Sequence, residues 1–172
     1  SGAKSQGLIT SSEDYLQLAK LYANADKPAD AASTLKDGIA KGALQESLEV
    51  NRLLGDVCTQ AEDDACAIDA YTKASALATD GNVDYQLGYM LFYSDRGAEA
   101  KAALQRAIQR GGLKQEGEAF VLLGDIESYA GNDAAALAAW TKAEGFPSTK
   151  AMAAQRIKAI KAGVKLKRSG NK

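Results

Sequence analysis

Two cysteines are the residues of this sequence whose chemistry depends most on their spacing. Cys58 and Cys66 flank a predicted turn at Glu62-Asp63-Asp64, with helix-forming residues on both sides. Thiols that face each other across a helical hairpin can form a disulfide if their Cα atoms lie within about 7 Å. They can equally be small buried thiols in a reducing compartment. A disulfide would indicate an oxidising compartment, whereas reduced cysteines would indicate the cytoplasm.

Other reactive groups are sparse. The sequence contains no histidine, which removes the usual general base, the serine and cysteine triads and most transition-metal sites. Gly111-Gly112-Leu113-Lys114 lacks the preceding strand of a phosphate-binding loop. Asp63 and Asp64 lie at a predicted helix start, where carboxylates suit the positive end of the dipole. We therefore expect no catalytic activity, no cofactor and no bound metal.

The sequence also repeats itself with a period of 69 residues. The stretch Leu53-Leu54-Gly55-Asp56 returns as Leu122-Leu123-Gly124-Asp125, and similar residues follow and precede both copies. A glycine is kept within a helix mainly where another backbone must come close. The period therefore predicts a duplicated pair of helical hairpins.

Each 69-residue copy contains two shorter repeats with the same order of small and large residues. A small residue is followed twelve positions later by alanine and four positions after that by a bulky residue. The small residues are Ala19, Gly55, Gly88 and Gly124, the alanines are Ala31, Ala67, Ala100 and Ala136, and the bulky residues are Leu35, Tyr71, Leu104 and Trp140. This order suits antiparallel helices whose backbones approach where each alanine faces the small residue and separate at the bulky one.

The pattern of small and aromatic positions resembles the tetratricopeptide repeat over roughly residues 12 to 148. The resemblance implies an all-α fold, a right-handed α-solenoid of four helix-turn-helix repeats at about 12–47, 48–80, 81–116 and 117–148. A capping helix over 149–162 should cover the last repeat. The expected caps include Ser11 and Ser148. Residues 1–10 are interpreted as a disordered linker or expression remnant and 163–172 as a basic flexible tail.

Charge is distributed unevenly along the chain. The net charge is −1, yet residues 1–149 carry 22 acids against 13 bases, while residues 150–172 carry eight lysines or arginines and no acid. An acidic body argues against nucleic-acid binding, which needs clustered basic residues. No stretch is long and apolar enough to read as a membrane span. These properties disfavour a nucleic-acid-binding body, and only the basic tail could contact nucleic acid.

The resemblance further implies a concave groove lined by the first helix of each repeat, which holds segments of partner proteins. Within it, Tyr85, Tyr89 and Phe92 form an aromatic stripe at i, i+4 and i+7. The stripe could form part of the binding surface or pack against neighbouring repeats. The predicted groove residues are Lys20, Arg52, Asp56, Tyr85, Tyr89, Phe92, Tyr93, Asp125 and Tyr129.

The repeat exits Lys41-Gly42-Ala43-Leu44 and Arg110-Gly111-Gly112-Leu113 look similar to those of bacterial envelope proteins associated with TonB-type transport systems. This likeness implies a non-catalytic interaction scaffold in the bacterial periplasm or envelope. The alternative is a structural adaptor that self-associates through its end repeats or convex faces. The expected oligomeric state is therefore a monomer or a weak dimer.

Overall fold

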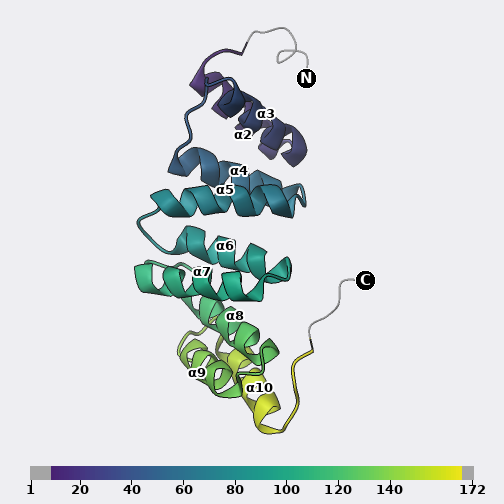
Figure 1. Ribbon diagram of the computed structural model, residues 1–172, viewed down its shortest axis with the longest axis vertical. Helices are drawn as coiled ribbons and strands as arrows, with labels where there is room; N and C mark the ends of the chain where they lie inside the picture. Colours follow the sequence, from purple (N-terminus) through teal and green to yellow (C-terminus); the bar gives the residue numbers. More distant parts are fainter. Residues whose placement is uncertain (1–8, 168–172) are drawn as a thin grey trace. The chain divides into compact units, whose positions relative to one another are not determined.

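The computed structural model describes residues 9–167, and this part of the chain is all-helical, as predicted. Residues 1–8 and 168–172, which belong to the predicted linker and tail, lie outside it. Within the described residues nine helices follow one another (Figure 1). They are α2 (Ser12–Asn24), α3 (Pro28–Ala40), α4 (Leu48–Gln60), α5 (Asp64–Leu77), α6 (Asn82–Tyr93), α7 (Gly97–Arg110), α8 (Glu116–Tyr129), α9 (Asp133–Ala143) and α10 (Lys150–Lys161).

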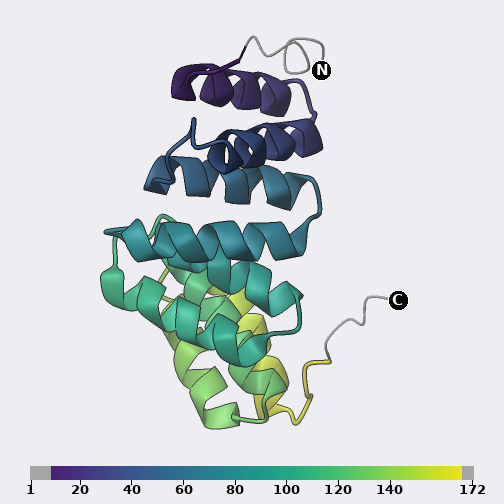
Figure 2. The same ribbon diagram turned by 45° about the horizontal axis from the view of Figure 1, so that its top comes forward.

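The helices form two compact units that divide between Ala78 and Thr79. In the first unit α2 pairs with α3 and α4 with α5, and α3 packs against α4 (Figure 2). In the second unit α6 pairs with α7 and α8 with α9, α7 packs against α8, and α10 packs against α9. The division falls between the second and third repeats, so each unit contains one copy of the 69-residue period.

Each hairpin turns at one residue in the left-handed conformation. These residues are Asp26, Glu62, Asp95 and Gly131, with φ angles of 57°, 58°, 65° and 81°. The amide of the residue that follows donates to a carbonyl five positions earlier, as Lys27 does to Tyr22 at 2.9 Å. This bond satisfies a carbonyl that the helix end leaves without a partner. The turn at Glu62 therefore begins where the sequence predicts.

Side-chain caps fix several helix starts. Ser11 and Asp14 form the predicted reciprocal capping box before α2, while Ser47 caps α4 and Asp63 caps α5. The prediction that Ser148 caps the last helix is wrong. Thr149 occupies that N-cap position, and its hydroxyl instead donates to the carbonyl of Ala143 at 2.8 Å. The hydroxyl of Thr149 thus satisfies a buried carbonyl at the end of α9.

A bulky side chain of the second helix covers the glycine of the first helix in three hairpins. A Cβ built on Gly55 would lie 2.5 Å from Tyr71, and one on Gly88 would lie 2.8 Å from Leu104. Trp140 covers Gly124 at least as closely. The nearest side chain at each of these glycines is the bulky residue, and at Gly88 the carbonyl of Ala100 would also lie 3.4 Å from the built Cβ. The glycines make room for a ring or a branched side chain.

The second unit has a continuous apolar core beneath α10. Phe120, Val121 and Trp140 are buried there with small alanines of α9 and α10. Ile157 and Ile160 of α10 pack against this cluster, which agrees with the expected capping role. Leu166 also packs against it, so the basic segment after α10 has one apolar contact with the core.

We predict that Gly124→Leu destabilises the second unit, because the new side chain would occupy the space of the Trp140 ring. The free energy of unfolding should fall by about 1 to 3 kcal/mol or more through overpacking. Chemical denaturation followed by circular dichroism measures it. Gly97→Leu is the matched control, because a Cβ on Gly97 meets no atom within 4 Å. Equal stability of the two variants would contradict this packing.

Candidate functional site

Aromatic side chains of α6 and α8 contact one another on the second unit. We call Tyr85, Tyr89, Phe92 and Tyr93 of α6, with Tyr129 of α8, the aromatic patch. The ring centroids of Tyr89 and Tyr93 lie 4.5 Å apart, and Phe92 meets Tyr93 edge-on at 5.1 Å. Phe92 also stacks on Tyr129 at 5.9 Å, which links the two helices. These separations lie in the range in which aromatic rings attract each other.

The patch is exposed although its base is buried. Tyr89, Tyr93 and Tyr129 have 44%, 57% and 38% of their surfaces exposed, whereas Phe92 has 8%. The opposite face of α6 supplies core residues, among them Leu87 and Leu91. Each of the two interpretations of the aromatic stripe therefore applies to a different residue. Phe92 packs between helices, whereas Tyr89 faces solvent and is available to a partner.

The phenols of Tyr85, Tyr89 and Tyr129 have raised pKa values and stay neutral at ordinary pH. Burial, with smaller contributions from Glu118, Tyr89 and Tyr93, raises the pKa of Tyr85 to about 12. Burial also raises the pKa of Tyr89, and then Tyr93 adds to the effect. The pKa of Tyr129 is raised by burial and by the charge of Asp125. Each hydroxyl can thus both donate and accept a hydrogen bond.

Asp125 lies beside this patch but is used inside the protein. Arg156 of α10 binds it through two hydrogen bonds, at 2.5 Å from Nε to Oδ1 and at 2.9 Å to Oδ2. The indole nitrogen of Trp140 donates to the same Oδ1 at 3.1 Å. The bond to Asp125 raises the pKa of Arg156. The carboxylate therefore ties α8, α9 and α10 together, and only 7% of Asp125 is exposed for a partner.

The three predicted site residues of the first unit, Lys20, Arg52 and Asp56, are not part of the aromatic patch. Lys20 of α2 forms an ion pair with Glu49 of α4 at 3.1 Å. Asp56 accepts a hydrogen bond from the hydroxyl of Tyr71 at 2.8 Å, and Tyr71 has a raised pKa, chiefly because of burial. Arg52 is exposed on α4. Two of the three thus support the packing of their own unit.

Cys58 and Cys66 are joined by a disulfide, with their Cα atoms 5.8 Å apart. The bond connects α4 to α5 across the turn at Glu62. Asp63 is close to both sulfur atoms, yet its carboxylate caps the start of α5. Thiolates, not a disulfide, are the ligands that bind metals, so this group is a structural crosslink in the state seen here.

Comparison with known proteins supports the fold. No protein-family model and no curated protein sequence matches the chain. The crystal structure of MamA matches at 25% sequence identity and a TM-score of 0.69, covering 83% of this chain and 82% of that one. The crystal structure of YrrB, described as a TPR protein with an unusual peptide-binding site, matches at 20% identity and a TM-score of 0.69. That match covers 88% of this chain and 76% of the YrrB chain.

These matches show that the chain has the tetratricopeptide-repeat fold, as its pattern of small and bulky residues predicts. Among the helices of residues 9–167, none is long and apolar enough to cross a membrane. In the second unit, this fold presents the aromatic patch on the first helix of each of its two hairpins.

We predict that loss of the disulfide lowers the free energy of unfolding by about 2 to 3 kcal/mol, because the crosslink closes a short loop of the unfolded chain. Reducing the wild-type protein, which leaves both sulfur atoms in place, should give the same loss as the Cys58→Ala/Cys66→Ala variant. Denaturation with and without reductant measures the difference. Two free thiols counted by alkylation of the unreduced protein would contradict the crosslink.

We also predict that Arg156→Met costs about 3 kcal/mol, since it leaves the buried carboxylate of Asp125 without its cation. Thermal and chemical unfolding of the second unit would report the loss. Lys158→Met is the control, because it removes a cation from an exposed position of the same helix. If both variants unfold alike, the pair of Arg156 and Asp125 contributes nothing specific.

Proposed function

We propose that this protein is a binding scaffold that holds a segment of a partner protein on the aromatic patch. The observation that carries the proposal is the contact of three exposed tyrosines above a buried phenylalanine. The core residues of α6 lie on its other face, so folding alone does not account for this exposed apolar surface. Tyrosine is enriched at binding hot spots, where it supplies a large contact area.

The order within the patch favours affinity. Tyr93 contacts both Tyr89 and Phe92, and Phe92 also stacks on Tyr129, so the rings are held before a partner arrives. A partner therefore loses less binding energy to the ordering of side chains. The neutral hydroxyls add hydrogen bonds that an extended backbone or a polar side chain can use. The fitting partner is a protein segment with apolar side chains and accessible amides.

The matched structures are consistent with this use of the fold. YrrB is described as having a peptide-binding site, and it shares the repeat architecture at 20% identity. A role in binding also agrees with a sequence that lacks histidine. We therefore assign the chain a non-catalytic role as an interaction scaffold.

We further propose that the scaffold works in an oxidising compartment, such as the bacterial periplasm or envelope. The disulfide between Cys58 and Cys66 supports this location, because such bonds persist where thiols are not kept reduced. The loose likeness to envelope proteins of TonB-type systems points to the same compartment. A transport or assembly complex there is the setting in which we would look for the partner.

Tyr89→Ala should weaken partner binding by roughly 2 kcal/mol, as hot-spot truncations do. The partner is first captured from the native cell with the wild-type protein, and its segment is then titrated by calorimetry. Leu77→Ala is the control, because Leu77 is another large exposed side chain, 53% exposed, on α5 of the first unit. A verified partner that binds the Tyr89 variant with wild-type affinity would place the site elsewhere.

A further inference from the structure

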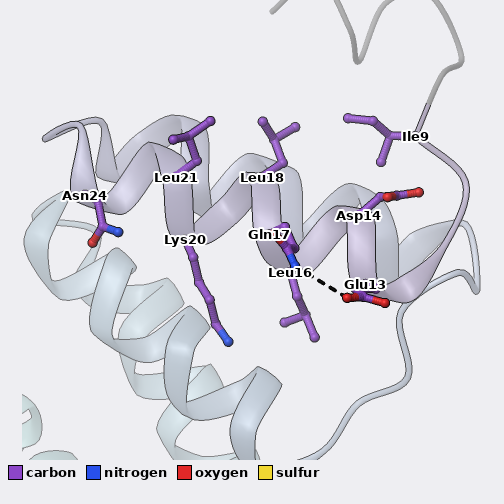
Figure 3. A pocket seen from close by; sticks show the side chains of 9 residues that line it. All are labelled: Ile9, Glu13, Asp14, Leu16, Gln17, Leu18, Lys20, Leu21 and Asn24. Atoms are coloured by element: carbon purple, nitrogen blue, oxygen red, sulfur yellow. Dashed lines mark hydrogen bonds between the residues drawn. The ribbon is translucent and has the colours of Figure 1, made fainter.

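The outer face of α2 carries an open hollow of about 1070 Å³ that the proposed function does not use. Figure 3 shows Ile9, Leu18 and Leu21 pointing to the same side of α2, away from the neighbouring helices. Leu21 is 63% exposed, the highest value among the large hydrophobic side chains of the described residues. Glu13 and Asp14 line the same hollow at the start of the helix, and Lys20, which is paired with Glu49, lines it nearer the other end. The face is therefore apolar with an acidic end.

Repeat packing explains why this face is open. In both units the first helix of a hairpin packs against the second helix of the hairpin before it, as α4 does on α3 and α8 on α7. Among the residues that the structure describes, α3 is the helix that α2 contacts most, and Leu21 on the outer face of α2 stays exposed. An exposed apolar face of a repeat protein normally needs a cover to stay in solution.

The last helix of the second unit and the segment after it have the opposite charge. Residues 150–167, which comprise α10 and the segment after it, carry six lysines or arginines and no acid. Arg156 is paired with Asp125, whereas Lys158 and Lys161 are exposed. Met152 and Val164 are 46% and 56% exposed on the same segment. This end therefore offers apolar side chains among uncompensated cations.

Charge makes the two ends complementary. Residues 9–78 of the first unit carry 12 acids against 6 bases, a net charge of −6, whereas residues 150–167 carry +6. Two first units, each with a net charge of −6, would repel each other, and so would two copies of the basic segment 150–167. Contacts between like charges are suppressed, while those between opposite charges are favoured.

We propose that a second copy of this chain covers the hollow: the basic segment 150–167 of one molecule docks on the outer face of α2 of the next. Met152 and Val164 would bury against Leu18 and Leu21, and the lysines would approach Glu13 and Asp14. Such a contact joins different surfaces of the two copies, so it propagates into open chains unless it closes into a ring. This surface is separate from the aromatic patch.

Sedimentation velocity at low and high salt tests the contact. At about 0.01 M salt the wild-type protein should associate as concentration rises, and at about 1 M salt the association should weaken at least tenfold, because screening removes the attraction between charges. A protein that stays monomeric at low salt and high concentration would overturn the proposal. So would an association that salt leaves unchanged.

Two variants distinguish the head-to-tail contact from symmetric dimers. Leu21→Asp blocks the α2 face and Met152→Asp blocks the α10 face, and each variant alone should lose association by about tenfold or more. Mixed in equal amounts, they should form dimers of one copy each and nothing longer, because each copy keeps one functional end. Self-association of either variant alone at the wild-type level would overturn the proposal.

Controls exclude a trivial loss of folding or a simple effect of charge. Ala102→Asp adds the same charge at an exposed position of α7, away from both ends, and should associate like the wild-type protein. Circular dichroism checks that every variant keeps its helicity. If Leu21→Asp unfolds, a reversal of charge at Glu13 and Lys158 tests the contact instead. Glu13→Lys alone and Lys158→Glu alone should each weaken association. The double variant should restore it, because the two charges are again opposite. No recovery in the double variant would overturn the contact.

Discussion

Close contact between a glycine of one helix and a bulky side chain of the next holds each unit together. Gly55 beneath Tyr71 and Gly124 beneath Trp140 let two helices pack around a ring that neither could bury alone. Trp140 and Tyr71 are nearly inaccessible to solvent as a result. Burial of rings of this size contributes strongly to stability, since each removes a large apolar area from water. The spacing of these residues therefore sets the register of each hairpin.

That register also decides which surfaces are left for function. Because Leu87, Gly88 and Leu91 fill the hairpin interior, the remaining face of α6 is free to carry tyrosines. The same logic applies to α8, where Trp140 and Arg156 hold Asp125 and so fix the helix from which Tyr129 projects. The aromatic patch is thus supported by a buried network of polar groups. Such support limits the loss of side-chain freedom when a partner binds.

Two compact units built from one duplicated pair of repeats also leave different ends. The first unit begins with a helix whose outer face is apolar and acidic, while the second finishes with a helix that is apolar and basic. Another buried ion pair, between Asp84 and both Arg106 and Arg110, joins α6 to α7 and has no counterpart in the repeat pattern. Sequence reasoning missed it because the equivalent positions in the other repeats are not acidic.

Local sequence determined the helices, their turns and the cap at Ser11. Periodicity and small residues at fixed spacing act over a few positions, so they can be identified without coordinates. The left-handed conformation of Glu62 and Asp95 was seen only in the structure. The candidate site was predicted only in part, since the sequence identified Tyr89 and Tyr93 but also included Asp125. Tertiary structure alone decided that Asp125 meets Arg156, 31 residues away, and that Phe92 is buried. Those outcomes depend on which helix faces which, because burial and charge pairing arise from contacts between distant segments.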